Sequence, residues 1–220
     1  MERSKKAVVL HSGGMDSSIC LALAIEEFGK GQVTALSFSY QQRHPQELIA
    51  GTTIARALGV TRVEIDLPFY SAITKNALLN KEIPIEHVEG APPNTLVIGR
   101  NGLMAQIAGI YAASIEASTL FLGVMGIEGA NSGYRDCSRS YMDLVQSLLR
   151  IDLDNPSFEI RTPLVAMTKK ETLGVAQRLG FLSYFLEETV TCYEGVKGKG
   201  CEVCPACLLR NEGIAHYFNA

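Results

Sequence analysis

The sequence lacks a long apolar run. Its longest uncharged stretch, 101–115, contains Asn101 and Gln106 and is shorter than the roughly 20 apolar residues that span a bilayer. Near the N-terminus, the apolar segment 7–10 is too short for the hydrophobic region of a signal peptide. The sequence therefore predicts no membrane-spanning helix, and we expect a cytoplasmic protein.

A long run of lysine or arginine is also absent. The chain carries 20 Lys and Arg against 23 Asp and Glu, which gives a formal net charge of −3. Proteins that bind along nucleic acid need a basic surface to neutralise the phosphates. We therefore expect no stable nucleic-acid partner, although a small anionic ligand is compatible with this balance.

The composition excludes disordered and collagen-like chains. Of the 220 residues, 47% are hydrophobic and 20% are charged, and the chain contains 20 glycines. A single α/β domain of this length is ordinary and buries a sizeable core without crosslinks. We expect one main domain.

Strand-like and helix-like segments alternate along the chain. Short apolar runs rich in β-branched and aromatic residues alternate with segments that have helical spacing, and this order is typical of parallel strands joined by crossover helices. The sequence therefore predicts a doubly wound, mainly parallel α/β sheet. The predicted strands are 7–10, 33–40, 63–67, 119–124 and 158–161, and the predicted helices are 17–28, 45–59, 103–111, 140–149 and 168–180.

Cysteines cluster near the C-terminus. Cys192, Cys201, Cys204 and Cys207 have the spacing C-x8-C-x2-C-x2-C, which suits tetrahedral ligation of one zinc ion. The alternatives are free thiols and an iron–sulfur cluster, but Asn211 stands where a ferredoxin-type run has its fourth cysteine. We predict a structural zinc site in a small appendage, 187–220, packed on a main domain over 1–186.

The segment Ser12-Gly13-Gly14-Met15-Asp16-Ser17 lies between the first predicted strand and the first predicted helix. Two glycines allow a tight turn, and a helix start offers unpaired N–H groups and a partial positive charge. This arrangement predicts a phosphate site, and Asp16 is suited to hold Mg²⁺ on a pyrophosphate group. The chain has no GxxxxGK[ST] motif, so the loop is not of the Walker type.

This Ser-Gly-Gly-x-Asp-Ser loop resembles that of the PP-loop ATP pyrophosphatases. Over nearly the whole chain, the sequence further resembles the 7-cyano-7-deazaguanine synthases. The second resemblance rests on the phosphate loop, on Gly99-Arg100-Asn101, on Ser132-Gly133-Tyr134-Arg135-Asp136-Cys137, on Thr162-Pro163-Leu164 and on the terminal cysteines. It implies an adenine nucleotide α hydrolase-like fold and a homodimer.

The activity that the resemblance implies is that of an ATP-dependent carbon–nitrogen ligase in queuosine precursor biosynthesis. The enzyme would convert 7-carboxy-7-deazaguanine, ammonia and ATP, with Mg²⁺, into 7-cyano-7-deazaguanine. Adenylation of the acid and amination would give an amide, and adenylation of the amide would then lead to the nitrile.

The resemblance also implies roles for individual residues. The catalytic residues would be Asp16, Ser17 and Lys169, and the substrate-binding residues would be Arg100, Asn101, Tyr134 and Asp136. The alternatives without a function in catalysis or binding are a solvent-exposed Lys169, and Tyr134 and Asp136 that only stabilise their loop. The zinc ligands would be Cys192, Cys201, Cys204 and Cys207. The ATP loop would comprise His11, Ser12, Gly13, Gly14, Met15, Asp16, Ser17, Ser18, Ile19, Cys20 and Leu21.

Three positions depart from the family pattern. Ser39 and Gln41 stand in place of aspartate and glycine, and Ile98 replaces a proline before Gly99. Gln41 restricts the backbone if φ is positive there. The alternatives to a synthase are another PP-loop enzyme that modifies tRNA or attaches a deazaguanine to a protein, and a zinc-knuckle module that binds nucleic acid.

Overall fold

The structure is a computed structural model that describes residues 5–74, 76–80, 82–85, 93–126 and 133–219. Ser132, the first residue of one motif noted above, lies outside these ranges. No helix in the described ranges is both long enough and apolar enough to cross a bilayer.

Five parallel strands form one sheet in the order β3-β2-β1-β4-β5. In chain order, β2 and β3 are added on one side of β1, and β4 and β5 are then added on its other side. This confirms the predicted doubly wound sheet. The strands are β1 (Ala7–Leu10), β2 (Val33–Ser39), β3 (Thr61–Asp66), β4 (Thr119–Leu122) and β5 (Glu159–Arg161).

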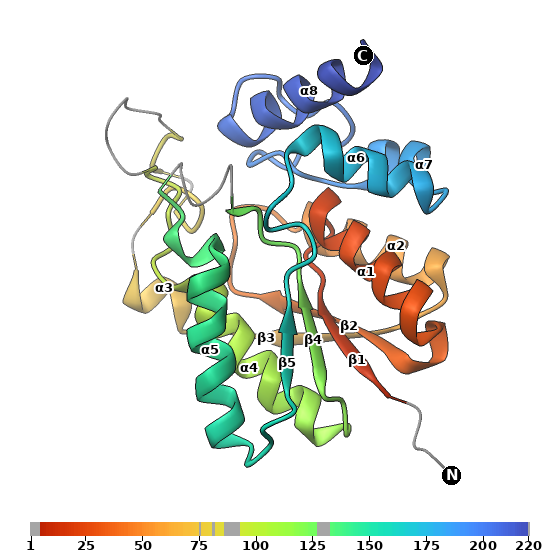
Figure 1. Cartoon of the computed structure of the whole chain (residues 1–220). Helices are drawn as coiled ribbons and strands as arrows, with labels where there is room; N and C mark the ends of the chain where they lie inside the picture. Colours follow the sequence, from red (N-terminus) through yellow and green to blue (C-terminus); the bar gives the residue numbers. More distant parts are fainter. Residues whose placement is uncertain (1–4, 75, 81, 86–92, 127–132, 220) are drawn as a thin grey trace.

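Helices cover both faces of the sheet (Figure 1), and a buried hydrophobic cluster fills the space on each side. On one face lie α1 (Met15–Phe28), α2 (Gln46–Leu58), α6 (Lys169–Arg178) and α7 (Leu182–Glu188). On the other lie α3 (Tyr70–Ile73), α4 (Arg100–Ser114) and α5 (Arg139–Asp152). The short 3₁₀ turns are η1 (Lys30–Gln32) and η3 (Arg135–Cys137), and α8 (Pro205–Phe218) is the last helix.

Local sequence signals explain several element boundaries. Pro45 and Gly59 bracket α2 as predicted, and Gly59 has the left-handed φ of 71° that favours glycine. Thr168 and Glu171 form a capping box at the start of α6, where each side chain accepts a hydrogen bond from the other residue's backbone N–H. This cap determines where α6 begins and therefore where Lys169 is placed.

The predicted strand 119–124 is shorter in the structure. β4 ends at Leu122 because the chain after it passes directly against the first turn of α1. A Cβ atom on Gly123 would lie 2.7 Å from the backbone nitrogen of Ser17, so only glycine fits without displacement. The close approach brings the end of β4 next to the phosphate loop.

The C-terminal helix α8 packs on α6, above the carboxyl ends of the strands (Figure 1). The helices meet closely at Gly213, where a Cβ atom would lie only 2.5 Å from Cβ of Lys169. The strand order reverses between β1 and β4, and in open α/β sheets ligands bind at such a switch point, beyond the carboxyl ends of the strands. The fold therefore predicts a site between this edge and α8.

Candidate active site

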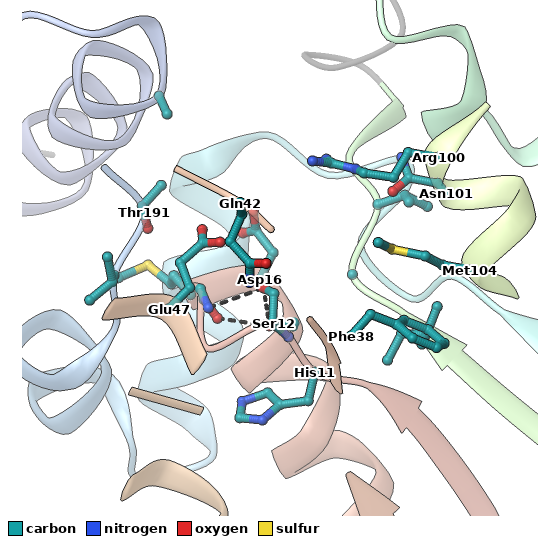
Figure 2. A pocket seen from close by; sticks show the side chains of 18 of the residues that line it. His11, Ser12, Asp16, Phe38, Gln42, Glu47, Arg100, Asn101, Met104 and Thr191 are labelled. Carbon is teal, nitrogen blue, oxygen red and sulfur yellow. Dashed lines mark hydrogen bonds between the residues drawn. The ribbon is translucent and has the colours of Figure 1, made fainter. Parts of the chain in front are cut away.

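A cavity of about 470 Å³ lies at the expected edge of the sheet. Its walls come from the ends of β1, β2 and β4, from the starts of α1, α2, α4 and α6, and from the segment that contains the clustered cysteines. Figure 2 shows the cavity with its polar side chains, which include Asp16, Gln42, Glu47 and Arg100. A pocket of this volume accommodates a nucleotide-sized ligand.

Internal hydrogen bonds hold the loop between β1 and α1. Ser12 Oγ accepts from the N–H of Gly14 at 3.2 Å, and the Ser12 N–H donates to Ser17 Oγ at 3.2 Å. Ser17 Oγ in turn donates to the Gly14 carbonyl at 3.0 Å. These hydrogen bonds within the loop hold its shape, which lowers the entropic cost of binding a ligand.

Gly13 is the residue that lets this loop pack against α2. Its φ of 95° is favourable only for glycine, and a Cβ atom there would collide with the carbonyl oxygen of Glu47 and lie 2.7 Å from the nitrogen of Gly51. The loop and the first turns of α2 are therefore in direct backbone contact.

The start of α1 faces the cavity and is suited to bind an anion. Among the residues that the structure describes, no side chain caps this helix, and Gly14 occupies the N-cap position. The first-turn N–H groups of Met15, Asp16 and Ser17 have no partner within the helix, and the helix dipole adds a partial positive charge. Met15, Asp16 and Ser17 all line the cavity.

Asp16 and Lys169 form an ion pair at the cavity wall. Lys169 Nζ lies 2.6 Å from both carboxylate oxygens of Asp16, and the lysine side chain is only 6% exposed. Lys169 is therefore not the solvated lysine of the alternative interpretation. Its ammonium group is held beside the start of α1, where a phosphate would lie.

The remaining residues of the predicted ATP loop pack in the core or form hydrogen bonds that stabilise the start of α1. Ile19, Cys20 and Leu21 are fully buried in the core. His11 Nε2 lies 3.0 Å from Ser18 Oγ, and Ser18 Oγ–H donates to the Gly14 carbonyl. His11 Nε2 is therefore the donor to Ser18, and burial lowers the pKa of His11 to about 3, so the ring is neutral.

Arg100 and Asn101 open α4 and line the cavity opposite the phosphate loop (Figure 2). Arg100 Nη1 donates to the hydroxyl of Tyr40 at 3.2 Å, and its guanidinium carbon lies 5.9 Å from the centre of the Tyr40 ring. The hydroxyl of Tyr40 and the carboxylate of Glu47 favour the charged form and raise the pKa of Arg100. Arg100 is thus a fixed cation in the cavity.

Asp136 and Tyr134 have different surroundings. Asp136 is 5% exposed, and its Oδ2 accepts from the backbone N–H of Asn101 at 2.9 Å, so it stabilises the start of α4. It is not among the residues that line the cavity. Tyr134 does line it, and its hydroxyl lies 2.5 Å from Thr95 Oγ1 and 3.3 Å from the hydroxyl of Tyr193.

The four clustered cysteines converge on one point. Their sulfur atoms all lie within 4.8 Å of one another, and those of Cys201 and Cys207 are 3.9 Å apart. A tetrahedral zinc ion with Zn–S bonds of about 2.3 Å separates its sulfur ligands by about 3.8 Å. Backbone N–H groups of Glu194 and Cys204 donate to the sulfurs of Cys192 and Cys201 at 3.3 Å. The geometry therefore suits a single metal ion.

The cysteine segment also builds the cavity. Thr191, Tyr193, Pro205 and Ala206 from this segment line the cavity. The N–H of Val190, just before it, donates to the carbonyl of Gly13 at 3.1 Å. A metal bound at the cysteines would thus stabilise one wall of the site.

Several cavity residues have no distinctive signal in the sequence. Glu47 lies in an ordinary helical pattern, and Gly123 is one glycine among 20. Tyr193 and Thr191 lie between the better-marked cysteines. The approach of Gly13 to α2 brings Glu47 to the site, and the approach of Gly123 to α1 brings the end of β4 there. The hydrogen bond from Val190 to Gly13 brings the segment of Thr191 and Tyr193.

The structure also describes the three departures from the family pattern. Gln41 has a φ of 59°, so a side chain occupies a left-handed position that glycine adopts at lower cost. Ile98 is 82% exposed and precedes Gly99, whose φ is 67°. Ser39 ends β2, where its carbonyl accepts from the N–H of Leu67 at 2.6 Å.

The model of one protein family, described as "Queuosine biosynthesis protein QueC", matches residues 6–218. The match contains every element of the sheet, the phosphate loop and the four cysteines. The chain belongs to the QueC family. This family assignment agrees with the sequence resemblance to the 7-cyano-7-deazaguanine synthases.

Three solved structures share the fold at low sequence identity. The NMN synthetase from Francisella tularensis is 16% identical with a TM-score of 0.51, and the match covers 98% of this chain and 84% of that one. The NH₃-dependent NAD synthetase from Campylobacter jejuni is 17% identical with a TM-score of 0.52, over 84% of this chain and 68% of that one.

A third structure, the U34-tRNA thiolase NcsA from Methanococcus maripaludis, is described with its [4Fe-4S] cluster. It is 15% identical with a TM-score of 0.51, and the match covers 99% of this chain but 65% of the thiolase. These likenesses support the α/β fold of the QueC-family chain.

The contact between Gly13 and α2 predicts different outcomes for two adjacent glycines. Gly13→Ala introduces both a strained φ and a clash with backbone, so we expect a loss of about 1–3 kcal/mol of unfolding free energy. Gly14→Ala is the matched control, because Gly14 has a φ of −79° and its Cβ atom would meet no backbone atom closer than 3.6 Å. Urea unfolding of both variants measures the difference, and equal stabilities would contradict the proposed packing.

Proposed function

We propose that this QueC-family chain is an ATP-dependent carbon–nitrogen ligase that converts 7-carboxy-7-deazaguanine and ammonia into 7-cyano-7-deazaguanine. The observation that carries the proposal is the uncapped start of α1, with Asp16 and Lys169 beside it, on the wall of a cavity that Arg100 also lines. Family membership supports the queuosine pathway.

The residues suggest how the chain would position ATP. The pyrophosphate group would lie on the N–H groups of Met15, Asp16 and Ser17, with Lys169 beside it, because these donors are fixed before ATP binds. Arg100, which lines the cavity opposite the phosphate loop, would neutralise the negative charge of the substrate carboxylate or of the α-phosphate. Catalysis would then come from positioning and charge stabilisation.

Asp16 is suited to hold Mg²⁺ on the pyrophosphate. Each of its oxygens accepts one hydrogen bond from Lys169 and keeps a further lone pair, and its side chain is 24% exposed at the cavity. Mg²⁺ bound to the phosphates would neutralise the negative charge that develops on the pyrophosphate as it leaves.

We further propose zinc at the cysteine cluster. A [4Fe-4S] cluster binds each cysteine through a different iron atom, whereas these sulfurs are close enough to share one ion. Four protein ligands leave no open coordination position, so the zinc would stabilise the cavity wall and take no part in the reaction. The proposal includes a homodimeric, cytoplasmic enzyme, as the family resemblance implies.

Product analysis tests the activity. We expect purified protein with 7-carboxy-7-deazaguanine, ammonium, Mg²⁺ and ATP to form the free nitrile with about two AMP per molecule, because two adenylations are required. Lys169→Met should lower kcat by about 100-fold or more, because it removes a fixed cation from the phosphate site. Lys170→Met, an exposed neighbour, is the control and should change kcat by less than about 2-fold.

Mass spectrometry distinguishes the alternative products. Formation of the amide alone would contradict the second adenylation, and formation of no AMP would contradict the ligase activity altogether. A deazaguanine attached to protein or tRNA would instead identify one of the other PP-loop activities.

Metal analysis tests the zinc proposal. We expect one zinc and negligible iron per chain, and chelation should lower Tm by at least about 5 °C, because metal binding contributes to folding. Cys201→Ser should lose the zinc, whereas Cys137→Ser should retain it, because Cys137 lies outside the cluster. Iron and sulfide in stoichiometric amounts would contradict the proposal.

A further inference from the structure

Two carboxylates line the described part of the cavity, and they differ in their surroundings. Asp16 is held by Lys169 through both of its oxygens. Glu47, from the first turn of α2, forms no ion pair or hydrogen bond through its carboxylate with any residue in the described ranges. A carboxylate that the protein leaves unpaired in a cavity is available to a ligand.

The position of Glu47 follows from the packing of the loop. Its carbonyl oxygen lies against Gly13, where a Cβ atom would stand, so the first turn of α2 is docked on the phosphate loop. Figure 2 shows the Glu47 side chain on the same side of the cavity as Asp16 and Gln42, with Arg100 and Asn101 across from it. Glu47 is thus near the place where the phosphate loop would hold the reacting end of ATP.

We propose that Glu47 is the general base that accepts the proton from ammonia as the amide forms. This inference rests on the proposed function. The ammonia nitrogen attacks the carbonyl carbon of the acyl adenylate, and the new C–N bond leaves the nitrogen positively charged. One N–H proton passes to the Glu47 carboxylate, the bond from carbon to the phosphate oxygen breaks, and AMP leaves with that electron pair.

The groups around Glu47 suit a base that works near neutral pH. Burial raises the pKa of Glu47 to about 7, and Arg100 from α4 opposes this rise. A carboxyl group with this pKa is ionised above pH 7 and is a stronger base than an exposed glutamate. Tyr40, whose own pKa burial raises, faces it from the end of β2 as a neutral group.

The other titratable groups of the cavity are less suited to this role. Lys169 is a cation held by Asp16, and burial lowers the pKa of His11 to about 3 while its Nε2 is committed to Ser18. Burial raises the pKa of the Cys137 thiol to about 11.

His44 and the tyrosines are excluded on similar grounds. His44 Nε2 donates to the carbonyl of Tyr193 at 3.1 Å, so its Nδ1 carries the lone pair. That nitrogen is fully buried, and a Cβ atom on Gly195 would lie 2.7 Å from it, so a ligand in the cavity does not reach it. Tyr193 is a buried phenol whose pKa burial raises further, and the hydroxyl of Tyr134 contacts Thr95 and Tyr193. Glu47 is the remaining base in the described part of the cavity.

The test separates activation of the acid from attack by the nitrogen nucleophile. ATP–pyrophosphate exchange with 7-carboxy-7-deazaguanine, in the absence of ammonia, measures adenylation alone. Hydroxylamine replaces ammonia in the second assay, because it is much less basic and most of it is uncharged at pH 7. Rates are compared at equal concentrations of the uncharged form, so that the titration of hydroxylamine itself does not enter the profile. Glu47→Gln keeps the shape of the side chain and the backbone contact with Gly13, and Glu26→Gln, an exposed carboxylate on α1, is the control.

We expect Glu47→Gln to keep the exchange rate within about 3-fold and to lower hydroxamate formation by about 100-fold or more. The wild-type rate of hydroxamate formation should rise with pH and level off above about 7, and Glu47→Gln should lack this limb of the profile. Glu26→Gln should match the wild type in both assays.

Two outcomes would overturn the assignment of the base. Hydroxamate formation by Glu47→Gln at a near-wild-type rate with an unchanged pH profile would show that another group accepts the proton. An equal loss of exchange and of hydroxamate formation would show that Glu47 acts in binding or adenylation. Absence of exchange in the wild type would instead overturn the proposed function, and the assignment would fall with it.

Discussion

The contact between Gly13 and the first turn of α2 is the constraint on which the rest of the site depends. A loop between a strand and a helix can bind phosphate only if its backbone turns sharply and its N–H groups face the ligand. Here Gly13 packs against the carbonyl of Glu47 and the backbone of Gly51, and its own carbonyl accepts a hydrogen bond from the N–H of Val190. One glycine thus joins α1, α2 and the cysteine segment at a single point.

The charges of the cavity follow from this arrangement. The start of α1 and Lys169 provide positive charge on one side, and Arg100 provides it on the other. Two anions, a nucleotide and a substrate carboxylate, could therefore lie close together without strong repulsion, since fixed cations offset their charge. Lys169 is kept in place by Asp16 and by the close approach of Gly213 on α8, so the C-terminal helix also supports this side of the cavity.

The fold and the phosphate loop could be predicted from the sequence because their signals are local. Alternating segments indicated the parallel sheet, and Thr168 with Glu171 indicated the start of α6. The four cysteines that the spacing singled out do converge in space. The possible positive φ at Gln41 could likewise be recognised from the family's glycine at that position, and the structure has it at 59°.

What could not be predicted depends on contacts between distant segments. The position of Glu47 in the cavity is determined by a backbone contact with Gly13, and no periodicity in α2 reveals it. The sequence equally could not show that Asp136 binds the start of α4 while Tyr134 faces the cavity, because the two residues are neighbours in one motif. Their side chains diverge only when η3 packs beside α4.

A crystal structure of the protein with a non-hydrolysable ATP analogue would show whether the start of α1 binds phosphate. We expect the terminal phosphates to bind the N–H groups of Met15, Asp16 and Ser17, with Lys169 Nζ within hydrogen-bond distance of a phosphate oxygen. We also expect the loop from Ser12 to Ser17 to keep its present hydrogen bonds. Phosphates bound away from the start of α1, or a loop that refolds to bind them, would contradict these expectations.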